Sequence, residues 1–253
     1  MRRVDRNSCL CPAEWDASVA KALPDHAEFQ RCATEFEKLK LNSQARRKGF
    51  AGHSPHALKR RKSGKLEFPA IWGRHKEIIA AMSHRKCVYC EGPINAPRAG
   101  SVEHFQPKSL FPSQAYEWTN YFLGCAGCNG AKSNKWPKRG GYVRPDEGDP
   151  SRHFVFKEDG TVEAAIPKSG AERMLDDFDL HREWLADKRK QNIEKMLRRL
   201  NDAIKFHRAG QCQLAARLAR RELNEITPDS AYSAALTQCF WRAWKSACPG
   251  VEV

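Results

Sequence analysis

The hydrophobic pattern of the chain is helical near both ends. Apolar residues recur every three or four positions from Phe29 to Leu39, after a helix start at Pro24-Asp25, and a short helix is predicted over residues 69–82. After Ser169 the helical period returns as three apolar stripes, which predict core-facing helices. The stripes comprise Ile193, Met196, Leu197, Leu200 and Ile204, then Leu214, Leu218 and Ile226 beyond Gly210, and last Tyr232, Leu236, Cys239, Phe240 and Ala243, with Asp229 or Ser230 as N-cap of the third helix.

The pattern changes twice between these helical ends. Residues 83–145 lose the long helical period and gain Pro, Gly and Cys, which indicates a small, irregular unit. Residues 153–164, H-F-V-F-K-E-D-G-T-V-E-A, place two β-rich runs around Asp159-Gly160, a strong hairpin signal. We therefore expect an α+β fold: a mainly helical chain with a small central module and a β-hairpin. The predicted regions are 1–81, 82–150 and 151–253.

The 253 residues fit one large domain or two to three small ones. No segment approaches the roughly 18 consecutive apolar residues of a membrane span. The first residues, M-R-R-V-D-R-N-S, contain no apolar run of the kind that a signal peptide needs. We expect a cytoplasmic protein with no membrane association.

Positive charge is unevenly spread along the chain, whose formal net charge is +14. Between Ser43 and Lys65 there are eight Lys and Arg residues and no acid, in a segment predicted to be a loop or an arm. Such a balance favours polyanions, nucleic acid first, although a solvated surface or an acidic protein partner fits the same composition. The contact candidates are Arg46, Arg47, Lys48, Lys59, Arg60, Arg61 and Lys62.

Two Cys-x-x-Cys pairs, Cys87-Val-Tyr-Cys90 and Cys125-Ala-Gly-Cys128, are separated by 34 residues. Each pair can place two thiolates on one ion, and together they complete a closed tetrahedral site, so the spacing predicts a structural zinc ion. Disulfides are disfavoured in a chain expected to be cytosolic. The remaining cysteines are interpreted as ordinary thiols: Cys9, Cys11, Cys32, Cys212, Cys239 and Cys248.

The loop between these pairs contains residues that a zinc site does not need. Glu103 and His104 lie side by side in V-E-H-F-Q-P-K. A neutral histidine near pH 7 can take a proton from water, and a carboxylate is a hard ligand that suits Mg²⁺ or Mn²⁺. Adjacent residues of a regular strand face opposite sides, so the two can share a site only if the strand ends or bulges there. Lys108 and Lys132 are candidate phosphate contacts.

The segments E-H-F-x-P-K, W-x-N-Y and C-x-x-C-N-x-x-K, from Cys87 to about Lys135, resemble the HNH nuclease motif. This resemblance implies a ββα-metal module held by a four-cysteine zinc site. It implies that His104 is the general base and that Asn120 orients the catalytic loop and the histidine. Glu103 and Asn129 match the two ligands of one divalent ion, Mg²⁺ or Mn²⁺. The family commonly has Asp and His at these two positions, so the identity of the ion stays open.

Further segments resemble the HNH subunits of bacterial anti-phage systems of the Septu type, some of them linked to retrons. These segments are M-R-R-V-D-R, R-P-D-E-G-D-P-S-R-H-F-V-F-K-E-D-G-T-V and L-H-R-E-W-L-A-D-K-R. In that family the nuclease works beside an ATPase with an ABC-type head. The resemblance therefore implies a PtuA-like ATPase partner.

These observations predict a metal-dependent HNH endonuclease that hydrolyses phosphodiester bonds, with DNA as the favoured substrate. RNA or tRNA is the alternative substrate, because positive charge attracts both backbones. Two alternatives from other classes are a catalytically inactive, zinc-stapled adaptor that binds nucleic acid and a zinc protein that serves only as a scaffold for the ATPase. Neither of these needs His104 together with Glu103, Asn120 and Asn129.

Overall fold

The computed structural model describes the chain except for residues 2–3, 7–9, 24–25, 39–67, 96–99 and 138–139. The basic segment 43–65, with all of its contact candidates, lies outside the described residues, as does Cys9. None of the helices in the described ranges combines the length and the apolar character needed to cross a membrane.

Helices dominate the described chain, and two short antiparallel sheets lie among them. The elements in chain order, with η for a 3-10 helix, are α1 (Trp15–Ala22), α2 (His26–Lys38), η4 (Ile71–His75), α4 (Lys76–Ala81), β1 (Gly100–His104), η5 (Pro112–Gln114), η6 (Trp118–Asn120), β2 (Tyr121–Cys125), α5 (Ala126–Lys132), η7 (Pro150–His153), β3 (Phe154–Phe156), β4 (Val162–Ala164), α6 (Gly170–Asp177), α7 (Glu183–Arg208), α8 (Cys212–Asn224) and α9 (Ser233–Ala247). The α+β fold class is confirmed.

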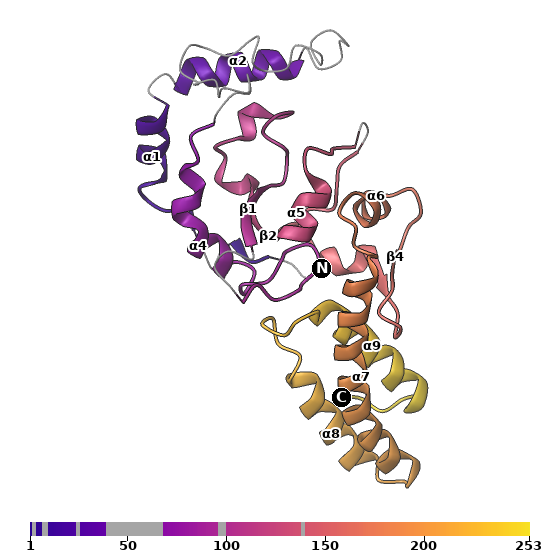
Figure 1. Cartoon of the computed structure of the whole chain (residues 1–253). Helices are drawn as coiled ribbons and strands as arrows, with labels where there is room; N and C mark the ends of the chain where they lie inside the picture. Colours follow the sequence, from indigo (N-terminus) through magenta and orange to yellow (C-terminus); the bar gives the residue numbers. More distant parts are fainter. Residues whose placement is uncertain (2–3, 7–9, 24–25, 39–67, 96–99, 138–139) are drawn as a thin grey trace.

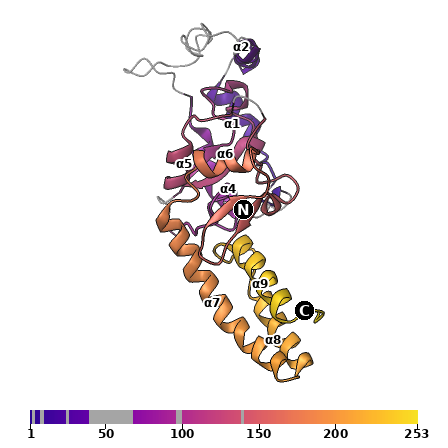
Figure 2. The ribbon, with the colours of Figure 1, turned by 90° about the vertical axis from the view of Figure 1, so that its right-hand side faces the viewer.

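The molecule is elongated. Helices α1 and α2 lie at one end, β1, β2 and α5 occupy the middle, and α7, α8 and α9 project at the other end (Figure 1). Figure 2, turned by 90°, shows the same order and the full length of α7 with α8 and α9 beside it. The central elements are therefore flanked by helices on both sides.

The predicted N-terminal helices are present. Helix α2 turns Phe29, Ala33 and Phe36 inward, with Cys32 only half-buried at the edge of that face. The helix expected over residues 69–82 is η4 continued by α4, which buries Ile79 and lies against β2. Elements η4 and α4 cover one side of the central strands, while α2 packs against η5.

The central sheet is a regular antiparallel pair that leads directly into a helix. Gly100 of β1 faces Cys125 of β2, and His104 faces Tyr121, with each residue between them paired in turn. Helix α5 begins immediately after β2, and the Sγ of Cys125 accepts the N–H of Cys128 at 3.5 Å as an N-cap. The result is a strand–strand–helix unit.

The predicted hairpin is formed by β3 and β4, with Phe154 facing Ala164 and Phe156 facing Val162. Gly160 at its turn has a φ of +84°, and a Cβ built there would lie 2.0 Å from the carbonyl oxygen of Ala186 in α7. The turn therefore packs on the backbone of α7 so closely that only glycine fits.

The C-terminal helices follow the predicted apolar stripes in most positions. On α7 the residues Ile193, Met196, Leu200 and Ile204 are buried, and Leu197 packs against the core from a half-buried position. Gly210, with a φ of +78°, separates α7 from α8 as expected. The stripe of α7 belongs to the hydrophobic core, as the periodicity indicated, but α8 differs: Leu214 and Leu218 are only half-buried, and Ile226 is buried beyond the end of the helix.

The predicted N-cap of the last helix is wrong. Helix α9 begins at Ser233, after Tyr232 in a left-handed conformation with a φ of +57°, and no side chain from Asp229 or Ser230 caps it. Glu91 supplies the cap instead: its Oε2 accepts the N–H of Ala234 at 2.9 Å, and its backbone carbonyl accepts the N–H of Tyr232 at 3.2 Å. The start of α9 is therefore fixed by a residue distant in sequence.

Candidate functional site

The four cysteines of the two Cys-x-x-Cys pairs come together, as predicted. The Sγ atoms of Cys87, Cys90, Cys125 and Cys128 all lie within 4.8 Å of one another, and those of Cys90 and Cys125 are 3.9 Å apart. Zinc–sulfur bonds of about 2.3 Å in a tetrahedron require sulfur atoms roughly 3.8 Å apart. The four sulfur donors therefore fit a zinc ion in both chemistry and spacing. The other described cysteines are free thiols outside this cluster.

An arginine at the start of α7 supports the cysteine cluster. The Nη2 of Arg182 lies 3.5 Å from the Sγ of Cys128 and 4.0 Å from that of Cys125. Its Nη1 donates to the carbonyl oxygen of Asp179 at 2.6 Å, which fixes the side chain. A guanidinium beside four thiolates offsets their negative charge. Sequence reasoning missed Arg182 because nothing near it in the sequence indicates a metal.

A pocket of about 380 Å³ opens between β1 and α5. Its wall includes Glu103, His104, Lys108 and Asn129. The ladder between β1 and β2 is regular up to His104, where β1 ends. The strand end, without a bulge, therefore lets the adjacent Glu103 and His104 both reach one pocket.

His104 is buried and held in one tautomer. Its Nε2 lies 3.1 Å from the carbonyl oxygen of Ala115; because a carbonyl only accepts, Nε2 carries the proton. The imidazole meets the rings of Trp72 and Tyr121 edge-on, with centroids 4.5 and 5.0 Å away. Burial, aided by the positive charge of Lys108, lowers the pKa of His104 to about 3. The ring is thus neutral, and its Nδ1 lone pair accepts no hydrogen bond from any described residue.

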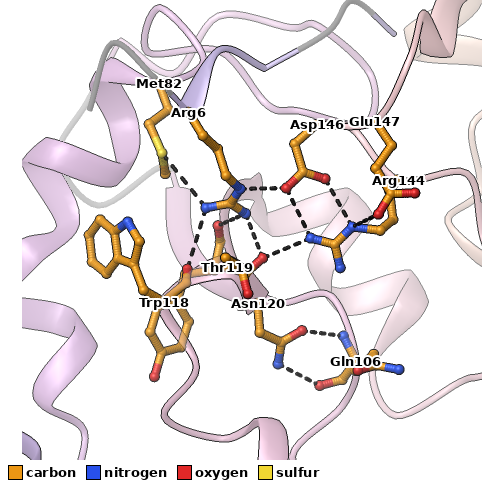
Figure 3. Close-up of polar contacts among 10 residues, drawn as sticks. Arg6, Met82, Gln106, Trp118, Thr119, Asn120, Arg144, Asp146 and Glu147 are labelled. Atoms are coloured by element: carbon orange, nitrogen blue, oxygen red, sulfur yellow. Dashed lines mark hydrogen bonds and ion pairs between the residues drawn. The ribbon is translucent and has the colours of Figure 1, made fainter. Parts of the chain in front are cut away.

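Asn120 ties together the two ends of the loop that follows β1. Its Oδ1 accepts the N–H of Gln106 at 2.8 Å, and its Nδ2 donates to the carbonyl oxygen of Gln106 at 3.0 Å (Figure 3). The same Nδ2 donates to the carbonyl oxygen of Gln114 at 2.8 Å. Gln114 precedes Ala115, the acceptor for His104. These bonds have the geometry expected of a residue that orients the loop and the histidine.

Glu103 and Asn129 come close to each other across Gly124. A Cβ built on Gly124 would lie 3.4 Å from the Cβ of Glu103 and 3.5 Å from that of Asn129. The Nδ2 of Asn129 donates to the Oγ of Ser101 at 2.7 Å, which leaves Oδ1 as the acceptor atom of the amide. The pocket thus has a carboxylate and an amide oxygen, which are the donor types that hard divalent ions prefer.

Lys132 does not occupy the position that a phosphate contact requires. Its side chain is fully buried, its Nζ forms an ion pair with Oε1 of Glu103, and it donates to the carbonyl oxygen of His104 at 2.8 Å. This arrangement is contrary to the phosphate contact predicted for Lys132, because no exposed ammonium remains. Burial raises the pKa of Glu103, and Lys132 opposes that rise. The lysine therefore holds both adjacent residues of β1.

Lys108 is more exposed than the buried pair of Lys132 and Glu103. It is half-buried, lines the pocket, and places its Nζ 4.3 Å from the centroid of the Trp72 ring. Its side chain, unlike that of Lys132, is not fully buried. Lys108 therefore stays a candidate phosphate contact.

The fold and the site define an α+β protein with a cluster of four cysteines that could hold a metal ion and a pocket lined by a buried histidine. No family model matches the chain. The chain resembles two proteins named Septu protein PtuB. The one from Bacillus thuringiensis is 34% identical over 88 residues, 34% of this chain and 34% of that protein. The one from Bacillus mycoides (strain KBAB4) is 29% identical over 144 residues, 45% of this chain and 49% of that protein. The chain thus spans half or less of these curated relatives.

Proposed function

We propose that this protein is a metal-dependent HNH endonuclease that hydrolyses phosphodiester bonds, with DNA as the favoured substrate. The observation that carries the proposal is the state of His104. A buried, neutral imidazole donates Nε2–H to a backbone carbonyl and keeps Nδ1 unprotonated at a pocket that also presents Glu103 and Asn129. An adaptor that only binds nucleic acid has no use for this arrangement.

Each residue of the site then has one task. His104 accepts a proton from the attacking water at Nδ1, a step that contributes on the order of 10²- to 10⁴-fold in rate. Asn120 keeps the loop and the imidazole in position. Glu103 and Asn129 hold one divalent ion, Mg²⁺ or Mn²⁺. When bound, that ion stabilises the charge on the phosphate and on the departing oxygen. Lys108 contacts the phosphate.

The cysteine cluster has a structural task in this proposal. Four thiolates fill all coordination positions of a zinc ion, so none remains for water or substrate. Cys90 precedes β1 and Cys125 is the last residue of β2, so a shared ion would join the segment before β1 to the junction of β2 and α5. The zinc therefore fixes the frame on which the pocket is built.

We extend the proposal to a cytoplasmic anti-phage complex in which this chain is the nuclease beside a PtuA-like, ABC-type ATPase. The likeness to Septu protein PtuB supports this extension. The formal net charge of +14 supports nucleic acid as the ligand. We propose further that the basic residues between positions 46 and 62 contact nucleic acid or the partner protein.

A cleavage assay tests the proposed function. Supercoiled plasmid and a matched single-stranded RNA are incubated with the protein in Mg²⁺ or Mn²⁺, with and without the ATPase. We expect plasmid cutting that His104→Ala lowers by at least 10²-fold. His84→Ala is the matched control, because His84 is an exposed histidine paired with Asp229 at 3.0 Å, away from the pocket.

The outcomes separate the alternatives. Equal cutting by the wild type and His104→Ala would contradict the assignment of the base. Faster cutting of RNA than of plasmid would move the substrate to RNA. Tight binding of nucleic acid by the wild type without any cutting, with or without the ATPase, would favour the inactive adaptor.

A further inference from the structure

Two arginines from distant parts of the sequence converge on the backbone on both sides of Asn120 (Figure 3). Arg6 donates from Nη2 to the carbonyl oxygens of Thr119 at 2.6 Å and Tyr121 at 3.2 Å. Arg144 donates from Nη2 to the same carbonyl of Thr119 at 2.9 Å. The residues before and after Asn120 are therefore both bound by guanidinium groups.

A buried carboxylate joins these two arginines. Asp146 forms an ion pair with the Nε of Arg6, and it accepts from the Nε of Arg144 at 3.0 Å and from its Nη2 at 2.9 Å (Figure 3). The Asp146 side chain is only 8% exposed. Burial alone would raise its pKa, but the two arginines hold the pKa below its ordinary value. The backbone adds a link, since the N–H of Val4 donates to the carbonyl oxygen of Pro145 at 2.7 Å.

The arginines also cover aromatic residues of the central unit. The guanidinium of Arg6 lies 4.5 Å from the centroid of the Phe122 ring, and that of Arg144 lies 5.0 Å from the Phe105 ring. Phe122 faces Glu103 in the ladder between β2 and β1, and Phe105 directly follows His104. The two rings that the arginines cover, Phe122 and Phe105, are thus each next to a candidate site residue.

Asn120 transmits this support to the pocket. It binds Gln106 through both backbone groups and Gln114 through its carbonyl oxygen. The next residue, Ala115, accepts the Nε2–H of His104. Hydrogen bonds, interrupted by the peptide links on either side of Asn120 and between Gln114 and Ala115, therefore connect Arg6 and Arg144 to the imidazole.

We propose that Arg6, Arg144 and Asp146 form a positioning clamp that fixes Asn120 and, through it, the loop that orients His104. This inference rests on the proposed function, because it assigns the clamp to the nuclease site. It gives a task to Arg6 in M-R-R-V-D-R and to Arg144 and Asp146 in R-P-D-E, none of which lines the pocket. None of the three residues touches the reacting atoms.

Amide hydrogen exchange of the full-length protein tests the clamp without any cleavage. The N–H of Gln106 reports on the loop, because it donates to Asn120 Oδ1. We expect Arg6→Met and Arg144→Met each to speed exchange at Gln106 at least tenfold, while the amide of Met196 in α7 changes by less than twofold. Arg152→Met is the matched control, because Arg152 is 84% exposed and pairs with Asp149 beyond this region.

Cleavage of plasmid then tests whether the clamp acts through Asn120. A 1 Å misplacement of catalytic groups can cost on the order of 10²-fold in rate. We expect Arg6→Met to lower kcat at least tenfold, and Arg6→Met with Asn120→Ala to be no slower than Asn120→Ala alone. Arg6→Lys, which keeps the charge but loses the planar fork, should recover only part of the rate.

The results divide cleanly. Unchanged exchange at Gln106 in Arg6→Met would overturn the proposal, as would an equal rise at Gln106 and Met196, which marks global destabilisation. Additive losses of rate in the double variant would overturn it too. If Arg6→Met does not fold, Arg6→Lys and Arg144→Met decide by the same criteria. A wild type that never cuts would contradict the proposed function, while the exchange data still decide the clamp.

Discussion

At the scale of single residues, the burial of His104 means that protonating its imidazole lowers the free energy of unfolding. The pKa of the folded state, about 3, lies below the ordinary value of 6.5, so the unfolded chain binds more protons between these values. The free energy of unfolding is therefore not reduced by His104 above pH 6.5, and it decreases as the pH falls from 6.5 toward 3. Between pH 8 and pH 5 the loss from this group is about 2 kcal/mol.

Chemical unfolding at pH 8 and pH 5 measures this term. His104→Gln is neutral at both values, so its free energy of unfolding should fall by about 2 kcal/mol less than that of the wild type. The cysteines are common to both proteins and cancel in the difference. Parallel pH profiles for the two proteins would show that His104 is not held neutral by burial.

Lys132 and Glu103 form a buried ion pair at the pocket wall, with side chains 1% and 5% exposed. Removing one partner leaves the other as an uncompensated buried charge, so Lys132→Met should destabilise the fold by about 3–5 kcal/mol. Adding Glu103→Gln to Lys132→Met should recover a large part of that loss. Lys135→Met, at an exposed lysine of the same region, is the control. A loss below about 1 kcal/mol for Lys132→Met would mean that the pair is not formed.

At the scale of elements, the hairpin β3–β4 depends on close approach to α7. Gly160→Ala would place a methyl group on the backbone of Ala186 and strain a positive φ, so we expect a loss above about 3 kcal/mol. Gly210→Ala has a similar φ of +78° but meets nothing within 4 Å, and should cost only about 1 kcal/mol. Thermal and urea unfolding of both variants measure the difference. Equal losses of stability in the two variants would show that the positive φ, and not the contact with α7, determines the effect of Gly160→Ala.

Elements with local signals were predictable from the sequence, and those set by distant contacts were not. The Asp159-Gly160 turn and the apolar stripe of α7 depend on neighbouring residues, and both are present. The start of α9 depends on Glu91, which lies more than a hundred residues earlier, so no local capping signal revealed it. The burial of Lys132 was not predictable, because its partner Glu103 in β1 is distant in sequence.

The candidate site shows the same division. The Cys-x-x-Cys spacing was enough to bring four sulfur atoms together. The division into regions 1–81, 82–150 and 151–253, and the roles of the site residues, stay predictions. Arg182 and the clamp of Arg6 with Arg144 join segments far apart in the chain, and only the folded structure shows these contacts.

At the scale of the whole molecule, the cysteine cluster links three parts of the chain. It joins the segment before β1 to α5, Arg182 brings in α7, and Glu91 next to Cys90 caps α9. We therefore expect one zinc per chain, and we expect Cys128→Ser to lose the zinc and most of the cooperative unfolding transition. Elemental analysis and calorimetry measure both. Cys212→Ser, at an exposed thiol, is the control. Full cooperativity in zinc-free protein would contradict this account.

In the proposed nuclease, a structural zinc and an exchangeable divalent ion have separate tasks in one small unit. Zinc-loaded protein, freed of other metals and supplied with its ATPase if cutting requires it, is titrated with Mg²⁺ or Mn²⁺ while plasmid cutting is measured. We expect no cutting without added ion, saturable cutting with it, and a higher ion requirement for Asn129→Ala. Cutting at full rate by zinc-loaded protein without added ion would show that no second ion is needed, and an unchanged requirement in Asn129→Ala would show that Asn129 does not hold it.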